Sequence, residues 1–186
     1  MQYQNVGTGV LIVDAFGNAI VNKKDNSHDY PYPDTLSLFG GGLEPYELAA
    51  EHLSPAQQAH LALRRELYEE LLHPQLVDEI VPRLVAFDKL ELPGKTTGQP
   101  LTYWPFLCLV DTETFGRWYD ILFLDGKARQ GVPRQGVIRP REGAQHYVPG
   151  TQWAALLPRK DQFLGELDQA FTTLLRCVPH LQLETR

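Results

Sequence analysis

The sequence predicts an α/β fold in which strands lie on both sides of a helix-bearing middle. Residues 8–16 (TGVLIVDAF) are apolar and β-branched and precede a Gly-Asn turn, a pattern typical of a β-hairpin. Residues 55–72 carry a helical period, and residues 101–112 (LTYWPFLCLVDT) have the composition of a strand. Because 186 residues can bury one substantial core, we expect a single domain over residues 1–186.

The other elements follow from turn residues and from local periodicity. They are expected as a hairpin partner over residues 19–24, a surface loop over 25–34, a short strand over 35–39, a strand over 79–92, a loop over 126–142, a strand over 144–148 and an amphipathic helix near 160–177.

Composition and charge exclude several classes of protein. With 43% hydrophobic and 22% charged residues, the chain is neither disordered nor fibrous. A net charge of −6 disfavours a nucleic-acid partner, which requires a broad basic surface. The start has no basic and apolar signal pattern and no stretch is long enough to span a membrane, so we expect a cytoplasmic protein without a membrane partner. Cys108 and Cys177 lack partners at zinc spacing and are interpreted as reduced packing thiols.

Three glutamates gather on one face of the predicted helix. Glu66, Glu69 and Glu70 fall within one arc, because spacings of three and four return to the same side of a helix. Their mutual repulsion would destabilise the helix unless it is offset, and Mg²⁺ or Mn²⁺ would offset it, since hard cations prefer carboxylate oxygens. A solvated acidic face supported by Arg64 and Arg65 is the alternative.

A glycine run lies upstream of these acids. The segment FGGGLEPYE contains Gly41 and Glu47 with five residues between them, and RELYEE covers residues 65–70. Together they resemble the signature of the Nudix hydrolase family, in which Gly, five residues, Glu and seven residues precede R-E-U-x-E-E-x-G-U, where U is aliphatic. By this resemblance, Glu47 would pair with Arg65 and brace the glycine loop against the helix.

The resemblance also implies a fold and a metal site. The family has an α/β/α sandwich around a mixed β-sheet. By resemblance, Glu66, Glu69 and Glu70 would be ligands of Mg²⁺ or Mn²⁺, and Gly41 would lend a backbone carbonyl.

Two features depart from the family pattern. Seventeen residues separate Glu47 from Arg65, so residues 48–57 form an insertion of ten that lengthens the loop or adds a helical turn. Ser54 before a proline then starts the helix. Leu72 stands where the family has glycine, so Pro74 is expected to end the helix in place of a left-handed cap.

The implied reaction is metal-assisted hydrolysis of a small-molecule diphosphate, such as a nucleotide sugar, ADP-ribose or a dinucleotide. The cation would lower the pKa of a bound water, and a carboxylate would accept its proton. Glu66 and Glu142 are the candidate bases, and Glu113 is a more distant competitor of Glu142.

Two groups of residues are candidates for substrate binding. The aromatic rings of Tyr103 and Trp104 could stack on a base, although core packing also explains them. Five cations could hold phosphates, although a solvated loop would also contain them. These cations are Lys127, Arg129, Arg134, Arg139 and Arg141.

A second hypothesis is a Nudix-fold module that binds or senses a nucleotide without cleaving it. The insertion and the missing glycine favour this reading, whereas the intact RELYEE segment opposes it. Members of the family often dimerise, so the resemblance leaves a homodimer open.

Overall fold

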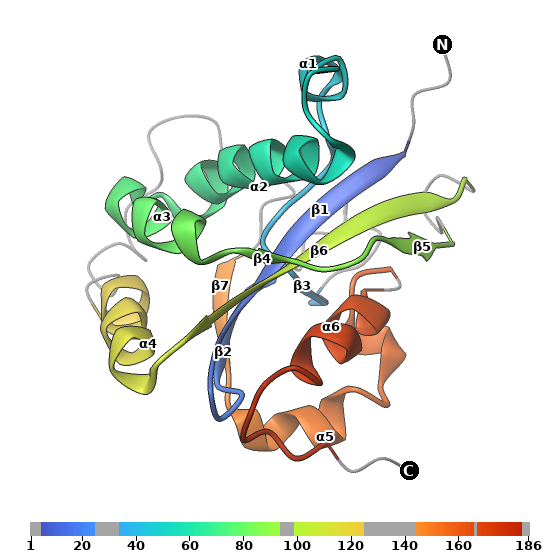
Figure 1. Cartoon of the computed structure of the whole chain (residues 1–186). Coiled ribbons are helices and arrows are strands. Elements are labelled where there is room, and N and C mark those ends of the chain that lie inside the picture. The colour runs from blue at the N-terminus through green and yellow to red at the C-terminus, as the bar shows by residue number, and fades with distance from the viewer. Residues whose placement is uncertain (1–4, 25–33, 94–98, 125–143, 166, 184–186) are drawn as a thin grey trace.

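The computed structural model describes residues 5–24, 34–93, 99–124, 144–165 and 167–183, and its seven strands in this part of the chain form one mixed sheet (Figure 1). The strand order is β3-β2-β1-β6-β4, with β5 also paired to β6 and β7 to β2. β1 runs parallel to β6 and antiparallel to β2. The strands are β1 (Val6–Asp14), β2 (Ala19–Lys23), β3 (Leu36–Ser37), β4 (Val85–Ala86), β5 (Leu90–Leu92), β6 (Leu101–Val110) and β7 (Ala144–Val148).

Helices cover both faces of this sheet. Figure 1 shows α2 and α3 on one side of it and α5 and α6 on the other. Each side has its own buried apolar cluster, one containing the inward residues of α2, α3 and α4, the other those of α6. Within the described residues, no helix combines the length and the apolar character needed to cross a membrane. The helices are α1 (Pro45–Leu48), α2 (Pro55–Leu71), α3 (Pro74–Ile80), α4 (Thr112–Tyr119), α5 (Trp153–Leu156) and α6 (Asp168–Leu175).

The predicted first hairpin is confirmed. β1 and β2 pair with Ile12 opposite Ile20, and Gly17 in the turn has a φ of 84°, a left-handed conformation that glycine adopts without a steric cost. The strands expected over residues 101–112 and 144–148 are also present, as β6 and β7. The loop expected over residues 126–142 lies outside the described residues.

The predicted helix over residues 55–72 is confirmed as α2, but its end differs from the prediction. The Ser54 hydroxyl oxygen accepts a hydrogen bond from the Gln57 N–H, and the Gln57 side-chain oxygen accepts one from the Ser54 N–H, so the start is a capping box. At the other end, Leu72 itself has φ 55° and ψ 23°. The left-handed cap is therefore kept by a leucine, and the prediction that Pro74 ends the helix in its place was wrong. Pro74 instead begins α3.

The strand predicted over residues 79–92 is wrong in its first half. Glu79 and Ile80 end α3, and Val81–Arg83 forms a 3₁₀ turn before the short strands β4 and β5. The apolar, β-branched composition of this stretch resembles that of a strand. Helical spacing decides the structure instead, because Leu76, Val77 and Ile80 lie on one face and are buried together.

The C-terminal helix is shorter than the predicted range of residues 160–177. Among the described residues of this range, only α6 is an α-helix, preceded by a 3₁₀ turn over Lys160–Gln162 and by Gly165 with a φ of 58°. Helix α4 was not predicted. The sequence does contain a signal for its start, because aspartate is a favoured N-cap residue. In the structure, the Asp111 side chain caps α4 by accepting a hydrogen bond from the Thr114 N–H.

Candidate functional site

Helix α2 carries the three predicted acids along the border of its buried face. Its inward side packs Ala59, Leu63 and Leu67 against the sheet. The side-chain exposure of the acids differs: 16% for Glu66, 38% for Glu69 and 9% for Glu70. Glu66 and Glu70, one helical turn apart, are therefore the two that are withdrawn from water.

The glycine loop between β3 and α1 lies directly against Glu66. A Cβ atom at Gly41 would come within 2.5 Å of the Glu66 Oε1 atom, so only a residue without a side chain lets the carboxylate lie there. Gly40 has a φ of 144°, and a Cβ there would lie 2.2 Å from the carbonyl oxygen of Thr8. The loop is fixed to β1 because the Thr8 N–H donates to the Gly41 carbonyl at 2.9 Å. That hydrogen bond uses one of the two lone pairs of the carbonyl predicted to bind metal.

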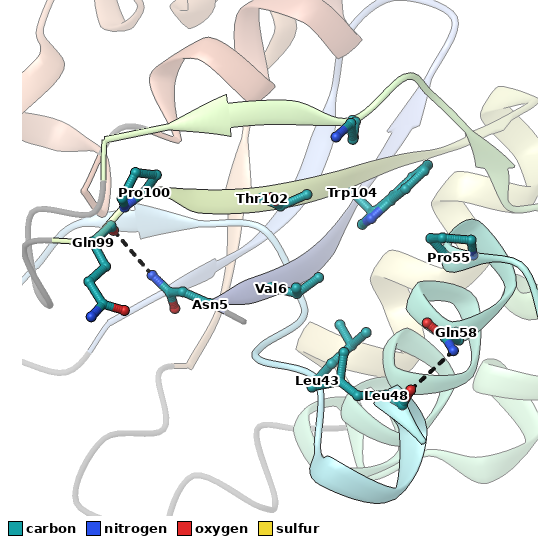
Figure 2. Close-up of a pocket in the computed structure, with 11 residues that line it drawn as sticks. Asn5, Val6, Leu43, Leu48, Pro55, Gln58, Gln99, Pro100, Thr102 and Trp104 are labelled. Atoms are coloured by element: carbon teal, nitrogen blue, oxygen red, sulfur yellow. Dashed lines mark hydrogen bonds between the residues drawn. The ribbon is translucent and has the colours of Figure 1, made fainter. Parts of the chain in front are cut away.

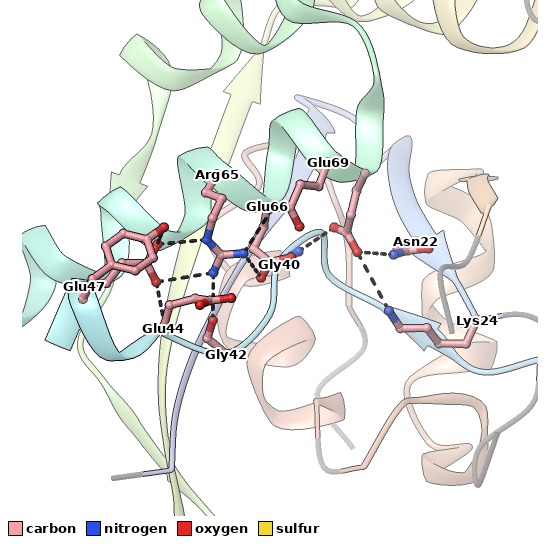
Figure 3. A network of polar contacts seen from close by, with 11 residues as sticks. Asn22, Lys24, Gly40, Gly42, Glu44, Glu47, Arg65, Glu66 and Glu69 are labelled. Carbon is pink, nitrogen blue, oxygen red and sulfur yellow. Dashed lines mark hydrogen bonds and ion pairs between the residues drawn. The ribbon is translucent and has the colours of Figure 1, made fainter. Parts of the chain in front are cut away.

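Arg65 joins the loop, α1 and α2 (Figure 3). Its Nε atom donates to Glu47 Oε1 at 3.0 Å, and one terminal nitrogen donates to the Gly42 carbonyl at 3.1 Å. The other terminal nitrogen donates to Glu66 Oε1 at 2.8 Å. Glu47 is fully buried and also accepts from the Glu44 N–H at 2.7 Å. The predicted pairing of Glu47 with Arg65 is therefore present in the structure.

These contacts set the ionisation of the pair at the centre of the site. Burial lowers the pKa of Arg65, but hydrogen bonds and charge interactions with Glu47 and Glu66 outweigh it and raise the pKa overall. Burial raises the pKa of Glu66 above its ordinary value, and Arg65 only partly opposes this effect. The guanidinium thus stays charged, and Glu66 is a stronger base than a glutamate in water.

Glu70 is held from the other side by the sheet. Its Oε1 atom accepts from the Asn22 Nδ2 atom at 2.7 Å and lies 3.9 Å from Lys24 Nζ, while its Oε2 atom accepts from the Gly40 N–H at 2.8 Å. Figure 3 shows Asn22 and Lys24 reaching this carboxylate from one side of the helix and Gly40 from the loop. Burial raises the pKa of Glu70 to about 7, against the opposing effects of Lys24 and Gly40.

The three acids of α2 already have cationic partners within the protein. As placed, the carboxylates are divided between two cations, Arg65 and Lys24. No three acidic, histidine or cysteine side chains of the described residues lie close enough together to hold a metal ion. Shared ligation by Glu66, Glu69 and Glu70 therefore requires rotation of their side chains and stays a prediction.

One buried atom supports the fit of a cation or another ligand. Asn22 is 2% exposed, and its Oδ1 atom has no hydrogen-bond partner among the described residues, although its Nδ2 atom is bound to Glu70. An unsatisfied buried acceptor costs free energy, and an amide oxygen is a donor that Mg²⁺ and Mn²⁺ accept. The Asn22 oxygen and the carboxylates of Glu66, Glu69 and Glu70 are all hard oxygen donors, the type that such a cation prefers, although the carboxylates are not gathered around one point as placed.

The similarity of this chain to known proteins lies in its structure. No protein-family model matches the sequence, and no curated protein matches it. Among solved structures, a NUDIX hydrolase from Alicyclobacillus acidocaldarius is similar with a TM-score of 0.58 and 10% sequence identity, over 95% of this chain and 93% of that one. The chain has the Nudix fold.

Two further structures share this fold. A bifunctional NMN adenylyltransferase/ADP ribose pyrophosphatase from Francisella tularensis, complexed with AMP and an Mn ion, is 14% identical with a TM-score of 0.54. The match covers 95% of this chain but only 42% of the Francisella protein. The NUDIX domain of NrtR from Shewanella oneidensis, complexed with ADP ribose, is 10% identical with a TM-score of 0.51, over 95% of this chain and 88% of that one.

The Nudix fold explains the α/β/α arrangement expected by resemblance, with the mixed sheet between two helical layers. Residues 48–57 are an insertion only by the resemblance to the family signature, and their effect relative to the family stays a prediction. Residues 48–57 contain the end of α1, a loop, and the first turn of α2. The Gln58 side chain fixes the loop by donating to the carbonyls of Leu48 and Ala50, at 3.3 and 3.1 Å.

Several predicted site residues are not placed. The candidate base Glu142 lies outside the described residues, as do all five cations predicted to bind phosphates: Lys127, Arg129, Arg134, Arg139 and Arg141. Glu113, the competitor of Glu142, lies exposed in the first turn of α4.

Sequence reasoning missed Asn22 and Lys24, which hold Glu70. Asn22 lies near the end of β2 and Lys24 directly follows that strand, in the segment VNKK, which has no feature that distinguishes it from an ordinary strand terminus. Their role depends on the sheet order, which places β2 and the glycine loop near the end of α2. Short-range sequence patterns do not show that arrangement.

Proposed function

We propose that residues 1–186 form one Nudix domain that hydrolyses a diphosphate linkage with Mg²⁺ or Mn²⁺. The substrate would be a nucleoside diphosphate linked to another moiety, such as a nucleotide sugar, ADP-ribose or a dinucleotide. The observation that supports this most is the bracket in which Arg65 joins Glu47, the Gly42 carbonyl and Glu66. It fixes the acidic face of α2 against a glycine loop, where a diphosphate can approach the backbone closely.

The side chains would divide the work as follows. Glu66, Glu69 and Glu70 would hold the cation, with the Asn22 amide oxygen beside them. When bound, such a cation neutralises charge on phosphate oxygens and lowers the pKa of a water ligand. Arg65 positions Glu66, as the hydrogen bond at 2.8 Å between them indicates.

The general base remains a choice between two predicted residues. Glu66 is supported by its burial, which raises its pKa and makes it a better proton acceptor near neutral pH. Glu142 is the alternative, in the segment that also contains Arg134, Arg139 and Arg141, which we propose bind the phosphates. The AMP and Mn ion in the Francisella structure and the ADP ribose in the Shewanella structure support this class of ligand.

Substitution of the acids tests the proposal. We expect Glu69→Gln or Glu70→Gln to abolish Mg²⁺-dependent turnover, because each removes one anionic ligand while keeping the shape of the side chain. Circular dichroism and urea unfolding should show a nearly unchanged fold. Glu51→Gln is the matched control, since Glu51 is an exposed glutamate in the loop before α2. Full activity in either acidic-face variant would contradict the assignment.

A second candidate function is nucleotide binding without hydrolysis. The pairing of the three carboxylates with Arg65 and Lys24 favours it, because cations of the protein itself already offset part of their negative charge. Calorimetric titration with Mn²⁺, combined with assays on nucleotide sugars, ADP-ribose, dinucleoside polyphosphates, NADH, coenzyme A and nucleoside triphosphates, separates the two. Metal or nucleotide binding without turnover on the whole panel would identify a binding module.

A further inference from the structure

A pocket of about 770 Å³ lies beside the N-terminal half of α2 (Figure 2). This volume is within the range of about 300–1,000 Å³ that is usual for small-molecule sites. The pocket is bordered by the first residues of β1 and β6, by Leu43 after the glycine loop, and by the ends of α1 and α2 that face each other. We call it the insertion pocket, because Leu48 and Pro55 of the ten-residue insertion form part of its wall.

The insertion is held in place as a wall of this pocket. Gln58, which also lines the pocket, donates to the carbonyls of Leu48 and Ala50 through its side-chain nitrogen. Figure 2 shows Gln58 and Leu48 together on one side of the pocket, across from Thr102 and Trp104 of β6. By the resemblance, residues 48–57 are additional to the family pattern, so we expect this wall to be missing from family members without them.

The lining favours a flat, uncharged ring. Trp104 is partly exposed and lies on the face of β6 opposite to Tyr103, whose side chain is packed into the other core cluster. None of the described residues that line the pocket is an acid, and its one cation, Lys89, is paired with Glu91 at 2.9 Å. Thr102 and Gln58 supply a hydroxyl and an amide beside the ring. An aromatic surface with a few polar groups is the environment in which nucleobases stack.

The pocket also lies at a suitable distance from the acids. Leu43 directly follows Gly42, whose carbonyl accepts a hydrogen bond from Arg65. Gln58 and Glu66 are eight residues apart on α2, which corresponds to about 12 Å along the helix. A ligand with its base in the pocket and its phosphates near Arg65 and Glu66 would therefore extend along α2.

We propose that the insertion pocket binds the nucleobase of the diphosphate substrate, stacked on Trp104. The inference rests on the proposed function, since it assigns a place to the part of the substrate that does not react. It also gives the insertion a role, which is to build the wall opposite Trp104 that selects the base.

Tryptophan fluorescence tests the binding step without phosphate chemistry. Trp118 and Trp153 are fully buried, so a ligand in the pocket would act mainly on Trp104. We expect at least one of adenosine, guanosine, cytidine and uridine to change the emission of the wild-type protein saturably. Calorimetry should show binding at least tenfold weaker in Trp104→Leu and largely retained in Trp104→Phe, which keeps an aromatic ring. Phe16→Leu, which changes an exposed aromatic residue at the other end of β1, should bind as the wild type does.

Kinetics on the best-hydrolysed substrate complete the test. Trp104→Leu should raise KM at least tenfold with little change in kcat, because the lost contact is made equally in the bound and transition states. If the Trp104→Leu variant hydrolysed the substrate with the KM of the wild type and also bound nucleosides as the wild type does, the pocket assignment would be overturned. If the wild type hydrolyses nothing but binds a nucleoside through Trp104, the pocket assignment stands and the proposed hydrolase activity fails.

Discussion

At Gly41, the absence of a side chain decides where the Glu66 carboxylate can lie. A Cβ atom added to Gly41 would lie 2.5 Å from the Glu66 Oε1 atom, which is closer than two such atoms can approach. Three glycines follow one another in this loop, and their demands differ. Gly40 needs a backbone conformation open mainly to glycine, Gly41 needs space for Glu66, and a Cβ at Gly42 would meet nothing nearer than 3.9 Å.

Gly41→Ala should therefore disturb the site and spare the fold. The atom in conflict is the end of a flexible side chain, so Glu66 can rotate away at a cost of less than about 1 kcal/mol in the free energy of unfolding. We expect kcat/KM to fall at least tenfold, because the added Cβ atom would displace the Glu66 carboxylate from the glycine loop, beside which the cation is proposed to bind. Gly42→Ala is the control and should retain activity. Equal activity of the two variants would show that the position of Glu66 against the loop is unimportant.

Leu72 carries backbone strain at the end of α2. Its φ of 55° is left-handed, which costs about 1–2 kcal/mol for an L-residue, and its side chain is 45% exposed, so little burial offsets that cost. Leu72→Gly should raise the free energy of unfolding by about 0.5–1 kcal/mol, measured by urea denaturation, after allowing for the greater backbone entropy of unfolded glycine. Leu72→Ala keeps the strain and should give no gain. A gain of the same size in both variants would rule out strain as the cause.

The helices and strands that the sequence predicted correctly are those marked by patterns of neighbouring residues. The apolar strands β1, β2, β6 and β7 and the capped helix α2 were all expected from periodicity and turn residues. The stretch over residues 79–92 was predicted to be a strand because its β-branched residues suit one, whereas Ile80 belongs to the buried face of α3 together with Leu76 and Val77. The RELYEE segment predicted the acidic face, and GGG predicted its loop. Asn22, Lys24 and the insertion pocket depend on how the elements are arranged, which no short motif encodes.

The ion pair between Glu47 and Arg65 is the main polar connection between α1 and α2. Glu47 is fully buried, and Arg65 is 21% exposed. Arg65→Met would leave the Glu47 carboxylate buried without its cation, so we expect a loss of about 3 kcal/mol in the free energy of unfolding. The double variant Glu47→Gln, Arg65→Met should recover part of this loss, because the buried charge is then absent.

Arg64→Met provides the control for this prediction. Arg64 is the preceding residue on α2 and is exposed, with its guanidinium 5.7 Å from the ring centre of Tyr68. Its removal should cost less than about 1 kcal/mol. If Arg65→Met were no more destabilising than Arg64→Met, the bracket would not be the structural support that we describe.

At the scale of the whole molecule, Glu79 joins two helices that are separate in the sequence, α3 and α4. Its carboxylate accepts from Arg117 at 3.0 Å and from the Trp118 Nε1 atom at 3.0 Å. The hydrogen bond from Arg117, with that from Trp118, lowers the pKa of Glu79 to about 2. The pKa of Glu79 in the folded protein thus lies below its ordinary value of about 4.5. The ionised carboxylate therefore stabilises the fold fully above about pH 4.5, and this stabilisation is lost as the pH falls towards 2.

Urea unfolding of Glu79→Gln at several pH values tests this link. The wild type should exceed the variant in stability at pH 5 to 7, and the difference should narrow between about pH 4.5 and pH 2. In an Arg117→Met background, the same substitution should have a smaller effect at neutral pH. A difference in stability between the wild type and the Glu79→Gln variant that does not depend on pH would show that ionisation of this carboxylate is not involved.

The two faces of the sheet carry different features. One face carries the acidic edge of α2 and the insertion pocket, whereas the other is filled by α6 and its aromatic neighbours. A substrate placed along α2 would reach from Trp104 to Glu66 without crossing the sheet. The proposed hydrolysis thus depends on a cation that binds at the acidic edge, where Glu70, Asn22 and the glycine loop meet.

Anomalous scattering from manganese-soaked crystals tests this central claim most directly. We predict a manganese peak within ligand distance of the Glu66 and Glu70 carboxylates, with Glu66 turned from Arg65 towards the ion, and no such peak in crystals of Glu70→Gln. Manganese-soaked wild-type crystals without a peak at these carboxylates, and with Glu66 still bound to Arg65, would contradict the claim.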